Sequence, residues 1–174
     1  MHELATTALR RAEIEEFTIS RTINAPLARV WRAWTEEEQL KQWWAPKGFA
    51  NLGVKLDLRV GGTMHYGLRS PDGVEFWGRF VYREIVPEQR LVLVLSFADE
   101  KGNVVRHPWD GRWPLQLLTT IEFADLGNQT EVTVHWIPVN ASGAEAKRFD
   151  EARESCKTGW SGTFDNLDAH IAKE

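Results

Sequence analysis

The chain has 174 residues, of which 43% are hydrophobic and 26% charged, and this length and composition fit one globular domain with a substantial core. Its net charge of −4 argues against a nucleic-acid-binding domain, which usually carries a basic surface. No apolar run approaches the ~20 residues that span a bilayer, residues 1–16 contain no signal-peptide segment, and the single cysteine, Cys156, excludes an internal disulfide, so we expect a cytoplasmic protein without stable membrane insertion.

The chain reads as one unit after a short N-terminal segment. We expect residues 1–14 to form a tail or a short helix and residues 15–174 to form a single domain, because no repeat or flexible linker divides them. Apolar and polar residues alternate over 17–23, which predicts the first strand.

Two short helices are predicted next. Pro26 suits the first helical position, and apolar residues then recur at helical spacing as far as Trp34. Thr35 and Glu38 have the spacing of a capping box, which predicts the start of a second helix. That helix should end near residues 43–46, where a proline follows two tryptophans.

The middle of the chain predicts strands joined by turns. Residues 91–97 are apolar on both faces, as in a central strand, and residues 98–114 form a long polar loop with two tryptophans. A bulge would exchange the two faces of a strand and so reverse the predicted inward-facing and outward-facing side chains. The assignment is least secure for Phe80–Ile85. The predicted strands are 52–56, 63–69, 76–85, 91–97, 115–123 and 130–137.

A long amphipathic helix is predicted from Ser142 to about Ile171, since apolar residues keep helical spacing along one face. Gly159 and Gly162 lie beside this apolar stripe, and each costs about 1 kcal/mol of helix stability relative to alanine. Either a bulky group approaches the helix there, or the helix bends, or the glycines are merely tolerated on an exposed face.

The order of these elements predicts an α+β fold. A curved antiparallel sheet of about six to seven strands should wrap around the long C-terminal helix, with two short helices after the first strand. The space between a curved sheet and such a helix is a natural ligand site. Nine tryptophans favour a cavity lined by aromatic rings, although the same residues can simply fill a core.

Short motifs are spread over most of the chain, and they are 23–26, 30–35, Leu40, 43–44, 57–62, 70–73, Gly78, 87–91, 159–160, Phe164, Leu167 and Ile171. Together these motifs resemble the START-related helix-grip superfamily (SRPBCC), in the branch that includes the C-terminal domain of the heat-shock-90 ATPase activator. The resemblance covers about residues 17–172 and implies a helix-grip fold with a deep cavity under the long helix. It implies no particular reaction, because the superfamily includes carriers, receptors, cyclases, hydrolases and co-chaperone domains.

The sequence contains none of the common motifs of metal, nucleotide or nucleophilic-hydrolase sites, so we expect no metal and no cofactor. Cys156 lies on the apolar helix stripe, where a buried thiol acts as a small hydrophobe with a raised pKa. The polar groups that can orient a ligand can equally be core residues paired with the backbone; they are Tyr66, Tyr82, Thr119, Thr163, His107 and Asp110.

The leading hypothesis is the binding of an apolar or aromatic small molecule. Of the adjacent Trp43 and Trp44, one should be core and the other near the cavity, and the loop with Trp109 and Trp113 should form a lid or be anchored to the body. The predicted ligand-binding residues are Trp44, Met64, Tyr66, Phe80, Tyr82, Leu95, Trp109, Trp113, Leu117, Thr119, Trp136, Phe149, Ala152, Cys156 and Trp160.

Two alternatives remain open. The protein can be a cyclase or hydrolase that acts on an aromatic or polyketide-like substrate by acid–base catalysis, which requires two polar groups with shifted pKa values in the cavity. It can also be a chaperone-associated module with an exposed binding patch; this partner is the least favoured, because the activator it resembles uses an additional N-terminal domain. Helix-grip domains occur as monomers and homodimers, and the sequence does not choose between these states, nor does it assign catalytic residues.

Overall fold

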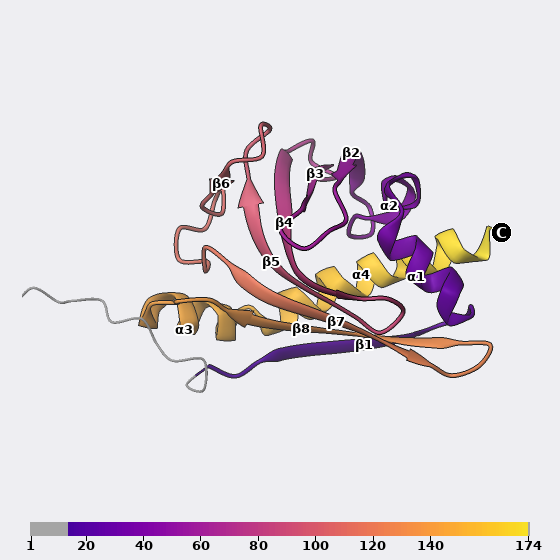
Figure 1. Ribbon diagram of the computed structural model, residues 1–174. Coiled ribbons are helices and arrows are strands. Elements are labelled where there is room, and N and C mark those ends of the chain that lie inside the picture. The colour runs from indigo at the N-terminus through magenta and orange to yellow at the C-terminus, as the bar shows by residue number, and fades with distance from the viewer. Residues whose placement is uncertain (1–13, 174) are drawn as a thin grey trace, which may run out of the picture.

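The computed structural model describes residues 14–173, so the predicted N-terminal segment lies almost wholly outside the described residues. Two short helices follow the first strand, and two helices close the chain (Figure 1). The elements are β1 (Phe17–Ile23), α1 (Leu27–Thr35), α2 (Glu37–Trp43), β2 (Ala50–Leu56), β3 (Thr63–Arg69), β4 (Glu75–Val86), β5 (Arg90–Ala98), β6 (Val104–Val105), β7 (Leu117–Asp125), β8 (Thr130–Pro138), α3 (Gly143–Glu151) and α4 (Arg153–Ala172).

The described strands form one antiparallel sheet in the order β1-β8-β7-β5-β4-β3-β2, with β6 paired to the C-terminal end of β5. Figure 1 shows the sheet curving around α4, with α1 and α2 near the C-terminal end of α4 and α3 at its other end. This arrangement confirms the predicted α+β fold class. The two-residue strand β6 is the exception, because it lies inside the segment that the sequence predicted to be loop.

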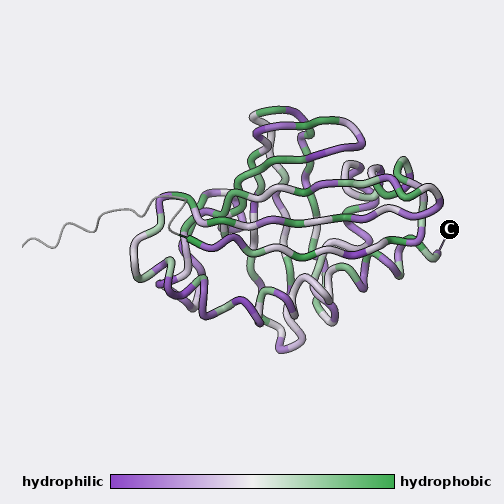
Figure 2. The backbone as a smooth tube through the Cα atoms, turned by 90° about the horizontal axis from the view of Figure 1, so that it is seen from below, coloured by the Kyte–Doolittle hydropathy of each residue, from purple (hydrophilic) through white to green (hydrophobic). Residues whose placement is uncertain are grey.

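Alternation along the strands separates an inner from an outer face, as the sequence predicts. On β7, Leu117, Thr119 and Ile121 are buried, whereas Glu122 between Ile121 and Phe123 is exposed. Figure 2 shows the same alternation as changes between hydrophobic and hydrophilic colour along the long strands. The inner face therefore carries the core and turns toward α4.

A bulge in β4 shifts the pairing with β5 between Tyr82 and Glu84. Phe80 and Tyr82 are buried, and Ile85 also packs against the core although it has the opposite parity. One extra residue in one strand reverses the faces beyond it. The register shift thus lies within Phe80–Ile85, the segment that the sequence analysis identified as most prone to a register error.

Two tryptophan side chains fill the core next to α1 and α2. The rings of Trp34 and Trp43 meet edge to face with their centroids 4.8 Å apart, and the indole nitrogen of Trp43 donates to the carbonyl of Ala33 at 2.9 Å. On the other side of α4, Arg21 of β1 bonds to Asp165 and Asp168 at 3.0 and 2.7 Å. The tryptophan contacts join α1 to α2, and the bonds of Arg21 join α4 to the edge strand β1.

The predicted capping box at Thr35 is wrong. Thr35 is the last residue of α1, and its hydroxyl donates to the carbonyl of Trp31 at 2.7 Å, a bond back along the helix that competes with capping. Helix α2 has Glu36 at its N-cap without a side-chain cap bond. The carboxylate of Glu37 instead accepts the backbone N–H of Leu56 at 2.8 Å, which ties α2 to β2.

The predicted C-terminal helix is divided. Ala152, with φ −91° and ψ 5°, separates α3 from α4. Ser142 caps α3 by accepting the backbone N–H of Glu145, and its hydroxyl donates to the Glu145 carboxylate. Ser142 and Glu145 have the spacing of a capping box, which the sequence analysis assigned to Thr35 and Glu38 instead.

The structural reasons for glycine differ between the two glycine positions of α4. A Cβ on Gly162 would lie 2.8 Å from the backbone nitrogen of Lys47, so a glycine is required where this loop crosses the helix. A Cβ on Gly159 would meet nothing within 4 Å, so no atom of residues 14–173 explains this glycine.

Candidate functional site

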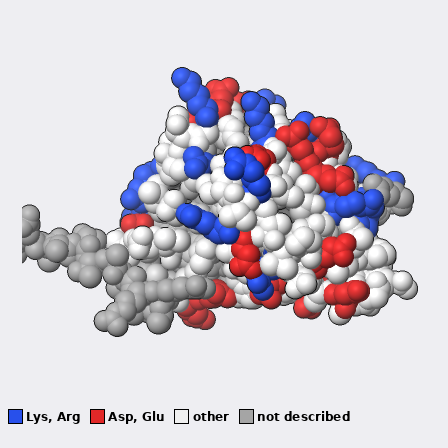
Figure 3. Space-filling view, viewed as in Figure 1, with Lys and Arg blue, Asp and Glu red and all other residues white. Residues whose placement is uncertain are grey.

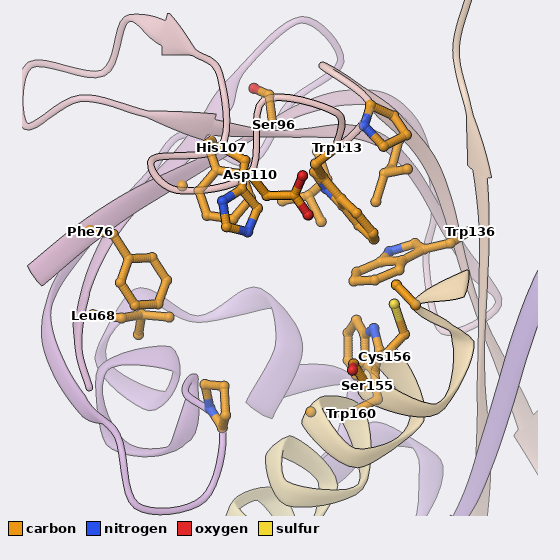
Figure 4. A pocket seen from close by; sticks show the side chains of 18 of the residues that line it. Leu68, Phe76, Ser96, His107, Asp110, Trp113, Trp136, Ser155, Cys156 and Trp160 are labelled. Carbon is orange, nitrogen blue, oxygen red and sulfur yellow. The ribbon is translucent and has the colours of Figure 1, made fainter. Parts of the chain in front are cut away.

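A cavity of about 330 Å³ lies between α4 and the part of the sheet formed by β3, β4 and β5. Figure 4 shows its open centre, with the loop after β6 on one side and α4 on another. The lining is mainly apolar, and it comprises Trp44, Ala45, Pro46, Tyr66, Leu68, Phe76, Trp77, Gly78, Leu95, Ser96, Phe97, His107, Asp110, Trp113, Pro114, Leu115, Leu117, Trp136, Arg148, Ala152, Ser155, Cys156, Gly159, Trp160 and Thr163.

Aromatic rings that pack on one another make the deep wall of the cavity. The ring of Trp44 meets those of Tyr66, Phe80 and Trp160 at centroid distances of 5.6, 5.3 and 5.7 Å. Trp136 meets Trp160 at 5.7 Å. Such edge-to-face contacts favour defined ring orientations, and they join the rings of this wall to one another.

Backbone bonds place Trp44 at the cavity. The side-chain amide of Asn51 donates to the carbonyl of Trp44 at 2.8 Å, and that of Asn166 donates to the carbonyl of Ala45 at 2.7 Å. Trp43 is therefore core and Trp44 lines the cavity, as the sequence predicts for this adjacent pair.

Tyr66 lies across Gly78 of the neighbouring strand. A Cβ on Gly78 would lie 2.3 Å from the hydroxyl oxygen of Tyr66, so only a glycine leaves room for the phenol ring. Burial raises the pKa of Tyr66 above its ordinary value, and its hydroxyl therefore stays protonated at neutral pH.

Charged side chains from two elements meet at the mouth of the cavity. Arg148 of α3 donates from Nε to Oδ2 of Asp110 at 2.6 Å, and this bond holds the pKa of Asp110 below its ordinary value. A second ion pair joins the same two segments, from Arg106 to Glu145 at 3.4 Å.

His107 lies beside Asp110 on the loop after β6. Its ring packs on Phe97 at a centroid distance of 4.4 Å, and its Nδ1 accepts the backbone N–H of Trp109 at 3.3 Å. Burial lowers the pKa of His107, against a smaller opposing effect of Asp110. The imidazole is therefore uncharged at neutral pH.

Cys156 of α4 also lines the cavity. Burial raises the pKa of its thiol from 9.0 to about 11, which makes it a weak nucleophile at neutral pH. This agrees with the prediction of an apolar role for this cysteine.

The structure brings nine of the fifteen predicted residues to the cavity. These are Trp44, Tyr66, Leu95, Trp113, Leu117, Trp136, Ala152, Cys156 and Trp160. Of the six polar groups proposed to orient a ligand, Tyr66, His107, Asp110 and Thr163 line it, and Tyr82 and Thr119 do not.

Six predicted residues lie elsewhere. Met64, Phe80, Tyr82 and Thr119 are on the inner face but buried in the core, where Trp44 covers Phe80 and thereby separates this row from the cavity. Phe149 is buried against the ring of Trp113, 5.9 Å away. Trp109 is 62% exposed and contacts Phe76 outside the cavity.

Sequence reasoning missed part of the lining. Leu68, Phe76 and Phe97 share the inward parity of Tyr66, Phe80 and Leu95, so alternation alone identifies their face. Arg148 and Ser155 carried no such signal, because they are polar residues of an amphipathic helix and only the fold brings them to the mouth.

Two further observations limit the chemistry of the described residues. Among residues 14–173 no three His, Cys, Asp or Glu side chains are placed to hold a metal ion. None of the helices in this range combines the length and apolar character that a membrane crossing requires.

Comparison with solved structures shows the fold. Protein Ms6760 from Mycobacterium smegmatis is 23% identical, with a TM-score of 0.74 over 90% of each chain. Protein NE0264 from Nitrosomonas europaea is 23% identical, with a TM-score of 0.72 over 93% of this chain and 96% of its own. A protein from Arthrobacter aurescens is 22% identical, with a TM-score of 0.74 over 98% and 93%.

Sequence comparison identifies the family. No curated protein matches the chain. A family model described as activator of Hsp90 ATPase homolog 1-like protein matches residues 24–172, nearly the whole chain. The resemblance that the sequence motifs indicated is confirmed by this match, and the chain belongs to the activator of Hsp90 ATPase homolog 1-like family.

Proposed function

We propose that this protein binds an apolar or aromatic small molecule in the cavity between its sheet and α4. One observation carries the proposal: about 330 Å³ of space is lined by packed aromatic rings and a few polar groups, which is the ordinary makeup of a small-molecule site. The fold supports a ligand-binding domain, and the cavity is the binding site that we propose.

Gly159 supports the same proposal. It lies within α4, where a glycine costs about 1 kcal/mol relative to alanine, and it faces the cavity with nothing within 4 Å of its missing Cβ. A ligand that lies against the helix backbone would account for this glycine.

The proposal is tested by filling the cavity from Gly159. Native mass spectrometry of the protein purified from its own host, followed by denaturing extraction, should find an apolar or aromatic molecule on the wild type. Gly159→Leu should lose this molecule while remaining folded. Thr158→Leu, the same side chain at the exposed neighbouring position, should retain it.

The results separate binding from an empty core. A wild type that carries no molecule, and whose melting temperature does not respond to a panel of lipids and aromatic compounds, would overturn the proposal. So would a Gly159→Leu variant that binds as well as Thr158→Leu.

Acid–base chemistry on the bound molecule is a second candidate. One observation favours it: His107 and Asp110, both with shifted pKa values, lie together in the cavity. An uncharged imidazole can accept a proton, and at His107 the accepting atom would be Nδ1, whose lone pair also accepts the N–H of Trp109. If this candidate holds, His107→Phe keeps the extracted molecule but stops its conversion to product.

The family name refers to activation of the Hsp90 ATPase. A chaperone-binding role would need a contiguous exposed apolar surface. The large apolar side chains exposed among residues 14–173 come from separate strands and turns and are Leu52, Val60, Val74, Val104, Trp109 and Leu126. The view in Figure 3 likewise shows positive and negative side chains interspersed between uncharged areas. The cavity therefore gives stronger support for a functional proposal than these exposed side chains do.

A further inference from the structure

The charged side chains and the imidazole of the cavity lie at one end, although the aromatic wall also carries the indole N–H groups of Trp44 and Trp136, which are buried and have no hydrogen-bond partner among the described residues. His107, Asp110 and Arg148 lie together at the mouth, while the deep wall consists of tryptophan, tyrosine and phenylalanine rings. Figure 4 shows the imidazole of His107 extending toward the open space beside the carboxylate of Asp110. A molecule that fills this cavity would therefore have an aromatic or apolar body and one polar end.

The hydrogen-bonding capacity at that end is mostly donating. Since Nδ1 of His107 accepts the amide of Trp109, the proton of the uncharged ring is on Nε2. Arg148 uses Nε for Asp110 and retains its two terminal nitrogens as donors. Within residues 14–173, the structure gives these His107 and Arg148 nitrogens no protein acceptor.

The acceptor oxygens of Asp110 at the mouth each have a protein donor. Asp110 accepts from Arg148 through Oδ2 and from the backbone of Arg112 through Oδ1 at 3.2 Å. Deeper in the cavity, the hydroxyl of Thr163 donates to the carbonyl of Gly159 at 3.0 Å. Ser155 is exposed at the rim and its hydroxyl can serve either role.

The charges at the mouth cancel. Asp110 and Arg148 form an ion pair, and burial keeps His107 uncharged at neutral pH by lowering its pKa. A ligand anion would face the carboxylate of Asp110, and a ligand cation would face the guanidinium of Arg148. An uncharged acceptor meets neither repulsion.

We infer that the ligand of this cavity is an aromatic or apolar molecule with an uncharged oxygen acceptor of the carbonyl type, and that His107 donates to that oxygen. The inference rests on the proposed function, because it assigns a chemical class to the molecule in the same cavity. The aromatic body lies against the tryptophan wall, and the oxygen lies at the mouth.

A set of naphthalenes with one varied substituent tests this inference. Equilibrium dialysis gives the dissociation constants of 2-ethylnaphthalene, 2-acetylnaphthalene, 2-(aminomethyl)naphthalene and 2-naphthoate. A hydrogen bond of ordinary net strength makes the ketone bind about fivefold more tightly than the hydrocarbon. The amine and the carboxylate should bind more weakly than the ketone.

Variants of His107 then identify the donor. His107→Phe should bind the ketone and the hydrocarbon equally, and His107→Gln, which keeps an N–H donor, should retain a preference for the ketone. His135→Phe is the matched control, because His135 lies on the outer face of the sheet, bonded to Glu16 and Glu122, and should leave the preference unchanged.

The outcomes distinguish this inference from the function on which it rests. If the wild type binds the ketone and the hydrocarbon equally, or if the preference survives in His107→Phe, the inference is overturned and cavity binding stands. Tighter binding of the amine or the carboxylate also overturns it. If no member of the set binds, the inference is overturned, whereas the proposed function falls only if the extraction and the melting-temperature panel also find no ligand.

Discussion

Asp110 on the loop after β6 and Arg148 on α3 are joined by a bond of 2.6 Å between Oδ2 and Nε. Both side chains line the cavity, and Trp113 of the same loop packs on Phe149 of the same helix. Because α3 is separated from α4 at Ala152, the loop and α3 form one cover over the cavity mouth. Exchange of a ligand should therefore depend on the contacts that hold this cover.

Breaking the Asp110–Arg148 bond should speed ligand exchange. In Asp110→Asn, the charge-assisted bond is weakened, and both the association and the dissociation rate of a cavity probe should rise by about fivefold, because a partly exposed bond of this kind stabilises by about 1 kcal/mol. Stopped-flow fluorescence with the uncharged probe N-phenyl-1-naphthylamine measures both rates. Glu84→Gln, which breaks the ion pair with Arg90 away from the cavity, should change neither. Unchanged rates in Asp110→Asn would show that the cover does not control access.

The same bond predicts a dependence of stability on pH. Arg148 lowers the pKa of Asp110 from its ordinary 3.8, so the carboxylate stabilises the folded protein fully above that value, and this contribution is lost as the pH falls through the lower folded-state pKa. The difference in melting temperature between wild type and Asp110→Asn should be constant from pH 7 to pH 5 and should shrink below pH 4. A difference that is the same at pH 7 and pH 3 would contradict the ion pair.

Strand alternation predicted which side chains face inward but not which end of the inner face is open. Met64 and Phe80 share the parity of Leu95 and Leu117, yet only the second pair lines the cavity. The ring of Trp44 packs on Phe80 and separates it from the cavity. Asn51 of β2 donates to the carbonyl of Trp44, and Asn166 of α4 donates to the carbonyl of the next residue, which positions this backbone. Contacts between segments so distant in sequence leave no periodic signal.

The polar mouth was predictable only in part. A long loop with aromatic and charged residues favours a functional role, and this identified His107 and Asp110 as candidates. Their partner Arg148 lies 38 positions beyond Asp110, on the polar side of a helix, where nothing in the sequence separates it from neighbouring solvent-exposed charges. Only the folded arrangement of the loop against α3 shows that Arg148 bonds to Asp110 at the cavity mouth.

The two glycines of α4 should respond oppositely to alanine. Gly159→Ala adds a methyl group in open space and should raise the free energy of unfolding by about 1 kcal/mol, the difference in helix propensity. Gly162→Ala places a methyl group 2.8 Å from the backbone nitrogen of Lys47 and should lower it by about 1 to 3 kcal/mol, as overpacking does. Urea denaturation measures both. Equal effects of the two substitutions would mean that the loop at Lys47 yields without cost.

Cys156 reports on the cavity from within. With a pKa of about 11 against an ordinary 9.0, its thiolate fraction at pH 8 is about 100-fold lower than that of a free thiol, since two pKa units separate them. Iodoacetamide should therefore modify the folded protein at least about 100-fold more slowly than the urea-unfolded chain, as followed by intact mass. Saturating 2-acetylnaphthalene should slow the reaction again, because the thiol lines the space that the ligand fills. The first comparison measures burial of the thiol and the second measures occupancy of the cavity, so each can fail independently. A folded-state rate above that of the unfolded chain would contradict the apolar role and make Cys156 an activated nucleophile.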